Sequence, residues 1–379
     1  MGRMAAEGNA QGLQVSLVTT TLLTKSMVAE TGPISMEVIS DGSEEGHAKQ
    51  VGIPAGSFFT QSCAVEIIYY NVYHERLSLQ DTVEDVSLPG LPELKLSELP
   101  SFVSDPDYLP AIRAFVLDQF VNIEKADWVF CNTVDQLEGE ELNWLRIIMP
   151  VKPIGPTVPS WYADQRVEED HDYGVSLWKK DSATCKEWLD DKDEGSVVYV
   201  SFGSLACLGS EKMEEIACAL KESDYHFLWV VRESEETKLP ENFAAETKEM
   251  VLVVRWCPQL EVLSHRAVGC FVTHCGWNSI LEGLTIGVPM VACPQWTDQP
   301  TNAKYIEEVW EVGIRAKVDD TGIVSRGELK SCIKEIMEGE RGVEIKKNTF
   351  KWKQLVKEAL EEGGSSDKNI EEFVASICG

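Results

Sequence analysis

The sequence predicts an α/β protein built on mainly parallel, doubly wound sheets. Short apolar segments rich in β-branched residues alternate with segments whose apolar residues recur at helical spacing. This alternation is typical of strand–helix–strand units, in which helices cover both faces of a parallel sheet. The length of 379 residues suits two domains of ordinary size, and a hydrophobic content of 44% is enough for globular cores.

Residues 1–150 are expected to form an N-terminal domain with few strand–helix units. Segment 14–20 (QVSLVTT) is predicted as a strand, segment 51–59 contains a second, and segment 128–132 (WVFCN) is a third. A strand–helix–strand unit takes about 30 residues or more, so a complete domain would crowd this space. We therefore expect the N-terminal domain to be incomplete.

Segment 151–195 is expected to be a linker. Prolines recur around its start, an acidic run follows at 168–170, and no periodicity is sustained; the prolines are Pro150, Pro153, Pro156 and Pro159.

Residues 196–365 are expected to form the C-terminal domain, with a last helix at 366–379. Segments 196–202 (SVVYVSF), 226–231, 250–255, 269–273 and 290–293 read as strands. Met213, Ile216, Ala217 and Leu220 mark a helix, and shorter helices are expected at 258–265 and at 278–286 before Gly287. Ser325 and Glu328 form a capping box that opens a helix continuing to Met337.

The composition excludes several partners. The net charge of −29 repels phosphate backbones and anionic lipid, so no nucleic-acid or membrane partner is expected. No apolar run has the length of a membrane span, and residues 1–12 lack the apolar core of a signal peptide. The eleven cysteines form no C-x-x-C pair and no zinc pattern, so we expect no metal and a reducing, cytoplasmic location for a monomer.

The segment FVTHCGWNS at 271–279 carries the strongest chemical signal. A predicted strand ends at Thr273, the chain turns through Gly276, and a helix begins near Asn278. Ligands of open α/β sheets bind at the carboxyl ends of the strands, where the N–H groups of a helix start suit a diphosphate. His274, Asn278 and Ser279 add side-chain donors, and Glu282, one helical turn further on, has a carboxylate that suits ribose hydroxyls.

Three other predicted strand ends add polar or flat side chains to the same edge. Gly203 allows close approach of the backbone and Ser204 offers a hydroxyl after the first strand of this half. Trp256 closes the strand at 250–255, where an indole can stack on a base. Asp298 and Gln299 follow the strand at 290–293 and can face sugar hydroxyls. Each residue alone is more often structural, and their shared position is what favours a site.

Residues 256–299 (WCPQLEVLSHRAVGCFVTHCGWNSILEGLTIGVPMVACPQWTDQ) resemble the signature box of plant secondary-product glycosyltransferases. With the SVVYVSFGS segment, the resemblance to family 1 UDP-glycosyltransferases runs from about residue 14 to the end. It implies a GT-B fold of two Rossmann-like domains, a UDP-glucose donor, a small-molecule acceptor, inversion and no cofactor. Segments 14–27, 57–65 and 88–103 resemble the group that includes glucose-ester-forming enzymes, whose acceptors are small, mostly apolar carboxylates, alcohols or thiols.

The resemblance also implies a role for each residue of the box. Trp256 stacks on uracil, the Cys257 backbone binds the edge of that base, and Gln259 and Glu282 hold the ribose. The diphosphate is bound by Ser204, His274, Asn278 and Ser279. The hexose is contacted by Trp277, Asp298 and Gln299, and a glutamine at the end of the box indicates glucose in preference to galactose.

The catalytic residues of the family are not found in this sequence. The family base is a histidine after the first strand, oriented by an aspartate further along, and none of the six histidines matches it (His47, His74, His171, His226, His265, His274). A gap at 47–54 falls where the aspartate strand is expected. We therefore expect an impaired glucosyltransferase or, alternatively, a catalytically silent UDP-sugar-binding protein. A dinucleotide-dependent oxidoreductase is disfavoured because no G-x-G-x-x-G fingerprint is present.

Overall fold

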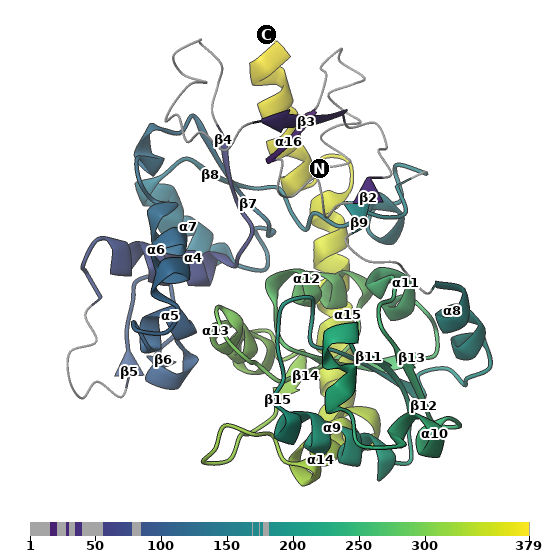
Figure 1. Ribbon diagram of the computed structural model, residues 1–379. Coiled ribbons are helices and arrows are strands. Elements are labelled where there is room, and N and C mark those ends of the chain that lie inside the picture. The colour runs from purple at the N-terminus through teal and green to yellow at the C-terminus, as the bar shows by residue number, and fades with distance from the viewer. Residues whose placement is uncertain are drawn as a thin grey trace.

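A computed structural model shows a two-part α/β molecule (Figure 1). The structure describes residues 16–20, 28–29, 35–39, 56–77, 85–168, 170–173, 175–176 and 182–378. Some predictions fall partly or wholly outside these ranges, among them the start of the strand at 14–20, the start of the 51–59 segment and the 47–54 segment with His47.

The C-terminal half contains a six-stranded sheet in the order β12-β11-β10-β13-β14-β15, and every neighbouring pair is parallel. Five of its strands were predicted from their β-branched runs. The sixth, the three-residue strand β15, was not predicted. The strands are β10 (Val197–Ser201), β11 (His226–Val230), β12 (Val251–Val254), β13 (Val268–Thr273), β14 (Met290–Ala292) and β15 (Gly313–Arg315).

Both faces of this sheet are covered, as a doubly wound fold requires. Val197 and Tyr199 of β10 pack into one hydrophobic cluster, whereas Val198 and Val200 pack into another on the opposite face. The prediction of a parallel, doubly wound α/β fold is therefore confirmed. The helices of this half are α9 (Ser210–Lys221), α10 (Phe243–Thr247), α11 (Gln259–Leu263), α12 (Trp277–Ile286), α13 (Gln299–Lys304), α14 (Arg326–Glu338) and α15 (Glu340–Leu360).

The N-terminal half is smaller in the residues that the structure describes. Its parallel three-stranded sheet has the order β4-β7-β8, with β4 at Gly56–Phe59, β7 at Trp128–Cys131 and β8 at Val151–Pro153. The short pairs are β1 (Ser16–Thr20) with β3 (Ser35–Ile39), β2 (Val28–Ala29) with β9 (Val175–Ser176), and β5 (Asp85–Val86) with β6 (Leu94–Lys95). The helices are α4 (Cys63–Tyr73), α5 (Ser101–Ser104), α6 (Pro110–Asp118) and α7 (Gly139–Ile148).

The segment expected to be a linker contains regular structure. It begins with the edge strand β8, continues through a 3₁₀ turn at Ser160–Tyr162 and ends in helix α8 (Ser182–Asp190). Pro153 fits in β8 because an edge strand can leave one side of its backbone unpaired.

The last helix, α16 (Ser365–Cys378), returns to the N-terminal half, and Figure 1 shows it leaving the end of α15 in that direction. The Ser366 hydroxyl donates to the Gly155 carbonyl at 2.7 Å, and the Asn369 amide donates to the Pro153 carbonyl at 2.8 Å. The ring of Phe373 packs edge-on against Phe130 of β7 with centroids 4.9 Å apart. The two halves are thus joined by α16 as well as by the 151–195 segment.

Candidate functional site

The order of the strands brings two turns together. The chain runs from β10 outwards to β11 and β12, then crosses to β13 on the other side of β10, so the direction of winding reverses between β10 and β13. Ser201 at the end of β10 is paired with Thr273 at the end of β13. The turns that follow these strands contain Ser204 and His274, and such a reversal is where open α/β sheets bind ligands.

The imidazole of His274 is held between two glycines. A Cβ atom added to Gly203 would lie 2.6 Å from the ring, and one added to Gly276 would lie 2.5 Å from its Nε2 atom. Gly203 also has a φ of +74°, so it is required for both its backbone conformation and its small size. The two glycines therefore fix the position of the ring.

His274 is neutral at physiological pH. Desolvation lowers its pKa to about 4, although a hydrogen bond with the Ser201 backbone acts in the opposite direction. Its Nδ1 atom is buried and makes no hydrogen bond within the protein. A buried polar atom without a partner is unusual, so this nitrogen is available to a ligand.

Helix α12 begins beside this ring. Its N-cap is Gly276, which offers no side chain to the first backbone N–H groups. Asn278 is exposed in this first turn, and Ser279 is 8% exposed and accepts a hydrogen bond from Gln259 Nε2 at 3.0 Å. Free N–H groups and the positive end of the helix dipole suit an anion here.

The structure does not place the Trp277 side chain as expected for a residue that contacts the hexose. Its side chain is 3% exposed and packs within the core, and its indole N–H donates to the Asn132 carbonyl at 2.7 Å. The indole ring therefore faces the N-terminal half, and a contact of Trp277 with a sugar would have to come from its backbone.

Gln259 and Glu282 are joined directly. Glu282 is 6% exposed, and its Oε2 atom accepts a hydrogen bond from Gln259 Nε2 at 2.8 Å. Its Oε1 atom accepts a hydrogen bond from the Tyr173 hydroxyl at 2.6 Å. Burial raises the pKa of Glu282, and these two hydrogen bonds act against the rise. Tyr173 was not predicted, because nothing in the proline-rich and acidic 151–195 segment indicates contact with a residue 109 positions away.

Trp256 and Cys257 follow β12. The Trp256 side chain is partly exposed, as a surface for stacking would need to be. Cys257 is buried, and its sulfur lies 3.4 Å from the hydroxyl of Tyr199 on β10. That hydroxyl also donates to Gln259 Oε1 at 3.2 Å. Tyr199 thus connects the Cys257 segment to the Gln259–Glu282 pair.

Asp298 and Gln299 lie at the start of α13. The Gln299 Oε1 atom accepts hydrogen bonds from the backbone N–H groups of Gln295 (2.8 Å) and Trp296 (3.1 Å). Its oxygen is therefore occupied, and its NH₂ group is the part that can face a sugar. Asp298 accepts a hydrogen bond from Asn302 Nδ2 at 2.7 Å, and burial raises its pKa to about 6.

Arg232 supports the Ser204 turn and was also missed by sequence reasoning. Its guanidinium donates to the Ser204 carbonyl at 2.6 Å and to the Ala206 carbonyl. The Ser204 side chain is partly exposed. The structure thus gathers all eleven predicted residues on the turns at the carboxyl edge of one sheet or on the helices that these turns open.

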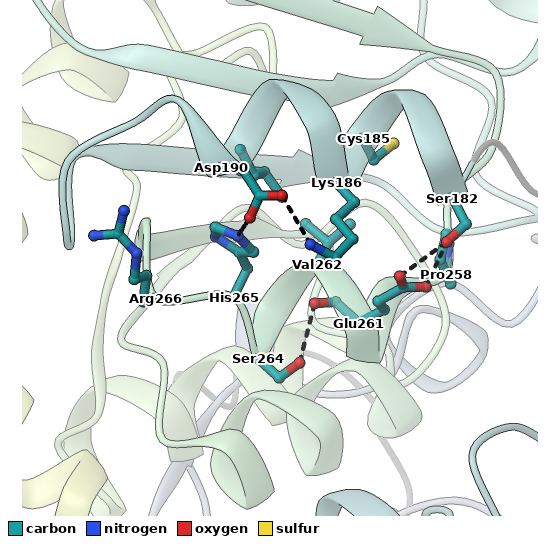
Figure 2. Close-up of a pocket in the computed structure, with 11 residues that line it drawn as sticks. Ser182, Cys185, Lys186, Asp190, Pro258, Glu261, Val262, Ser264, His265 and Arg266 are labelled. Atoms are coloured by element: carbon teal, nitrogen blue, oxygen red, sulfur yellow. Dashed lines mark hydrogen bonds and ion pairs between the residues drawn. The ribbon is translucent and has the colours of Figure 1, made fainter.

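A separate cavity of about 370 Å³ lies between α8 and α11 (Figure 2). Several of its polar side chains contact one another: Asp190 accepts from Lys186 at 2.8 Å and lies 3.1 Å from His265, and Glu261 accepts from the Ser182 hydroxyl at 2.7 Å. None of the predicted donor-binding side chains lines this cavity. Its contacts hold α8 against α11, the helix that begins at Gln259.

Neither a metal centre nor a membrane span was found where the structure is described. Within those ranges no group of three or more His, Cys, Asp and Glu side chains is arranged to hold a metal ion. Among the helices of those ranges, none combines the length and the apolar character that crossing a bilayer demands.

This chain is similar to known proteins in both sequence and fold. Residues 170–359 match the family described as UDP-glucoronosyl and UDP-glucosyl transferase. Mogroside I-E synthase of Siraitia grosvenorii is 52% identical over 331 residues, which cover 87% of this chain and 73% of that protein. Flavonol 7-O-beta-glucosyltransferase UGT74F1 of Arabidopsis thaliana is 51% identical over 333 residues, again 87% of this chain and 73% of that protein. The crystal structure of Os79 from O. sativa in complex with UDP is similar with a TM-score of 0.91 and 34% identity, covering 99% of this chain and 96% of that one.

Proposed function

Because this chain belongs to the UDP-glucosyl transferase family of plants and shares the GT-B fold of its solved relatives, we propose that it binds UDP-glucose and transfers glucose to a small, mostly apolar acceptor with inversion. The observation that carries the donor assignment is the convergence of His274, Asn278, Ser279 and the start of α12 at the point where the winding of the sheet reverses. These groups would bind the diphosphate of the donor.

The same groups suit the chemistry of transfer. In a single displacement, the acceptor attacks the anomeric carbon as its bond to UDP breaks, and negative charge grows on the leaving diphosphate. Backbone N–H groups at a helix start and a neutral imidazole are fixed dipoles that stabilise such charge where it develops. We assign that role to the first turn of α12 and to His274, with Ser204 on the adjoining turn.

The nucleoside would lie on the other side of these groups. Trp256 offers a partly exposed ring for the uracil, with the Cys257 backbone beside it, and Glu282 and Gln259 offer polar groups for the ribose. Asp298 and Gln299 at the start of α13 would face the hexose, with the Trp277 backbone contributing from α12. Glucose is the proposed sugar because the Gln299 amide, whose oxygen is already occupied, presents a fixed pair of N–H donors.

The acceptor class is proposed from the relatives and from the sequence. One relative is named as acting on the 7-hydroxyl of a flavonol. A small acceptor bearing a hydroxyl, carboxylate or thiol, and in particular a glucose-ester product, is our proposal for this chain. We also propose a reducing compartment such as the cytoplasm, which the ten free cysteines among the described residues support.

A second candidate function is a UDP-sugar-binding protein without turnover. It is favoured by the placement of the five described histidines, of which only His274 lies at the proposed donor site. His226 and His265 lie at or near the amino ends of β11 and β13, the opposite edge of the sheet. His74 packs on Tyr70 and His171 on Trp161.

Calorimetric titration of the whole chain with UDP tests the donor assignment. We expect saturable binding that Trp256→Ala weakens by about 1–3 kcal/mol, as loss of a stacking surface does elsewhere. Trp256→Phe keeps a ring and should recover most of that loss. A folded chain that takes up no UDP at millimolar concentration would refute the proposal, and UDP-galactose competing as well as UDP-glucose would refute the role of Gln299.

A further inference from the structure

Asn132 connects the N-terminal half to the proposed diphosphate turn. It follows β7 and is 3% exposed. Its backbone N–H donates to the Phe59 carbonyl at 3.0 Å, and its carbonyl accepts the Trp277 indole N–H at 2.7 Å. In its side chain, Oδ1 accepts from the Thr157 backbone N–H at 2.8 Å, and Nδ2 donates to Asn278 Oδ1 at 3.4 Å. Every polar group of Asn132 thus has a partner.

We propose that Asn132 is a positioning residue for the donor diphosphate and that it acts by orienting the amide of Asn278. The inference rests on the proposed function, in which Asn278 donates to the diphosphate. An amide side chain can present either its oxygen or its NH₂ group in a given direction. Because the Asn278 oxygen faces the Asn132 NH₂ group, the NH₂ group of Asn278 is directed elsewhere and is available to an anion.

The surroundings of Asn132 prevent its own amide from turning over. Thr157 donates to its oxygen, so the reversed amide would place two N–H groups against each other. Gly155 approaches so closely that a Cβ atom there would lie 2.6 Å from Asn132 Oδ1 and 2.5 Å from the Thr133 nitrogen. The 155–157 segment therefore packs directly on Asn132 and fixes the direction of its NH₂ group.

Through this arrangement, a residue of the N-terminal half affects donor binding at the proposed site in the C-terminal half. The distance of 3.4 Å marks a weak hydrogen bond, so its own contribution to affinity is small. The larger effect is on the orientation of Asn278, because a hydrogen bond to a charged group is stronger than one between neutral groups. A change at position 132 should therefore affect the binding of a phosphate and spare the binding of a nucleoside.

Asn132→Asp in the whole chain tests this inference. The substitution keeps an oxygen for Thr157 but places a second acceptor against Asn278 Oδ1. Calorimetry with UDP and with uridine should show UDP affinity reduced by about tenfold, which corresponds to one hydrogen bond to a charged group, and uridine affinity changed by less than about twofold. A direct repulsion between the new carboxylate and the diphosphate is separated by repeating the substitution in an Asn278→Ala background.

If Asn132 acts through Asn278, the effect of Asn132→Asp on UDP binding should largely disappear in that background. An undiminished effect there, or equal losses for UDP and uridine, would overturn the inference and leave the proposed donor site in place. Unchanged UDP affinity in Asn132→Asp would do the same. Failure of the unaltered chain to bind UDP would instead overturn the proposed function and the inference together.

Discussion

At the scale of single residues, the hydroxyl of Tyr173 occupies an oxygen of Glu282 that we propose binds the ribose. It donates to one oxygen of that buried carboxylate at 2.6 Å, and Gln259 occupies the other. The Tyr173 side chain is otherwise 54% exposed, so little packing holds it in place. A ribose hydroxyl that binds Glu282 Oε1 would have to displace this phenol.

We therefore expect Tyr173→Phe to tighten uridine binding by about 0.5–1.5 kcal/mol, the net value of one hydrogen bond. Calorimetry would measure it, and uracil, which lacks the ribose, serves as the matched ligand because its affinity should not change. Weaker uridine binding in the variant would show that the phenol contacts the nucleoside and does not compete with it.

A second residue-scale feature is the buried carboxyl of Glu138 in the N-terminal half. Glu138, which precedes α7, is fully buried, and its Oε1 atom accepts from the Ala64 backbone at 3.1 Å. Burial, together with the neighbouring Glu141, raises its pKa to about 8. Glu66 nearby is also fully buried, and burial raises its pKa well above the usual range.

A carboxyl with a raised pKa stabilises the fold less as the pH increases. Below about pH 4 Glu138 is protonated in both states, whereas between about pH 4 and 8 it loses its proton on unfolding, which favours the unfolded state. Glu138→Gln keeps the acceptor for Ala64 and cannot ionise. We expect urea unfolding at pH 5 and pH 8 to show a smaller loss of stability with pH in the variant than in the parent. Parallel pH profiles for the two proteins would contradict this.

The predictable residues were those that lie in one continuous segment. Residues 256–299 contain the strand ends and helix starts that the sheet brings together, so all but Ser204 of the predicted residues come from this stretch. Asn132 and Tyr173 were not predicted, because their contacts with Trp277 and Glu282 join positions 145 and 109 residues apart. Such contacts depend on how the two halves meet, which no local pattern contains.

At the scale of elements, the position of α16 depends on contacts with both halves of the molecule. It follows α15 in the C-terminal half, but its contacts include the N-terminal sheet, through Phe373 on Phe130 and Trp128 and through Lys152 with Glu372 at 2.8 Å. The buried carboxylate of Asp367 also pairs with Arg166 at 2.8 Å. The helix thus fastens one half to the other.

Phe373→Ala should lower the free energy of unfolding by about 1–3 kcal/mol, the usual loss for removing a partly buried aromatic side chain. Urea denaturation would measure the change, with Glu371→Ala, an exposed position on the same helix, as the control. Equal stability of the two variants would mean that α16 contributes nothing to holding the halves together.

Helices and strands were predictable where the apolar residues followed a single pattern, either a continuous β-branched run or helical spacing. The β-branched runs of the C-terminal sheet predicted five strands, but β15 is three residues long and β8 ends in a proline. Helix α4 was given no bounds from the sequence, because its residues 63–71 are all buried and no polar stripe marks a helical period. Helix α8 follows the acidic run and was included in the expected linker.

At the scale of the whole molecule, residues of both halves support the proposed donor site, whereas no described histidine is placed there to activate an acceptor. The turns of the proposed donor site are supported from both halves by hydrogen bonds of Asn132, Tyr173, Tyr199 and Arg232. By contrast, His265, which lies 3.1 Å from Asp190, is part of the cavity wall shown in Figure 2 and not of the donor site. His274 is neutral, and its ring is held between Gly203 and Gly276 at the turn that we propose binds the diphosphate. In the described part of the chain, the proposed site therefore contains no histidine placed to deprotonate an acceptor.

This difference predicts which acceptors react. A phenol is largely protonated at neutral pH, so its reaction depends on a general base, which typically increases the rate by about a hundredfold to ten-thousandfold. A carboxylic acid is already ionised at this pH and does not need the base. We expect the chain to form glucose esters slowly, with little change between pH 6 and 8, and to glucosylate phenols poorly or not at all. Mass spectrometry of products from one phenol and one carboxylic acid at matched concentration, with UDP-glucose, would measure both rates. Rapid turnover of the phenol with a bell-shaped pH profile would contradict the prediction and show that another group acts as the base. The first positions to replace would then be His74 and His47, of which His47 lies outside the described residues.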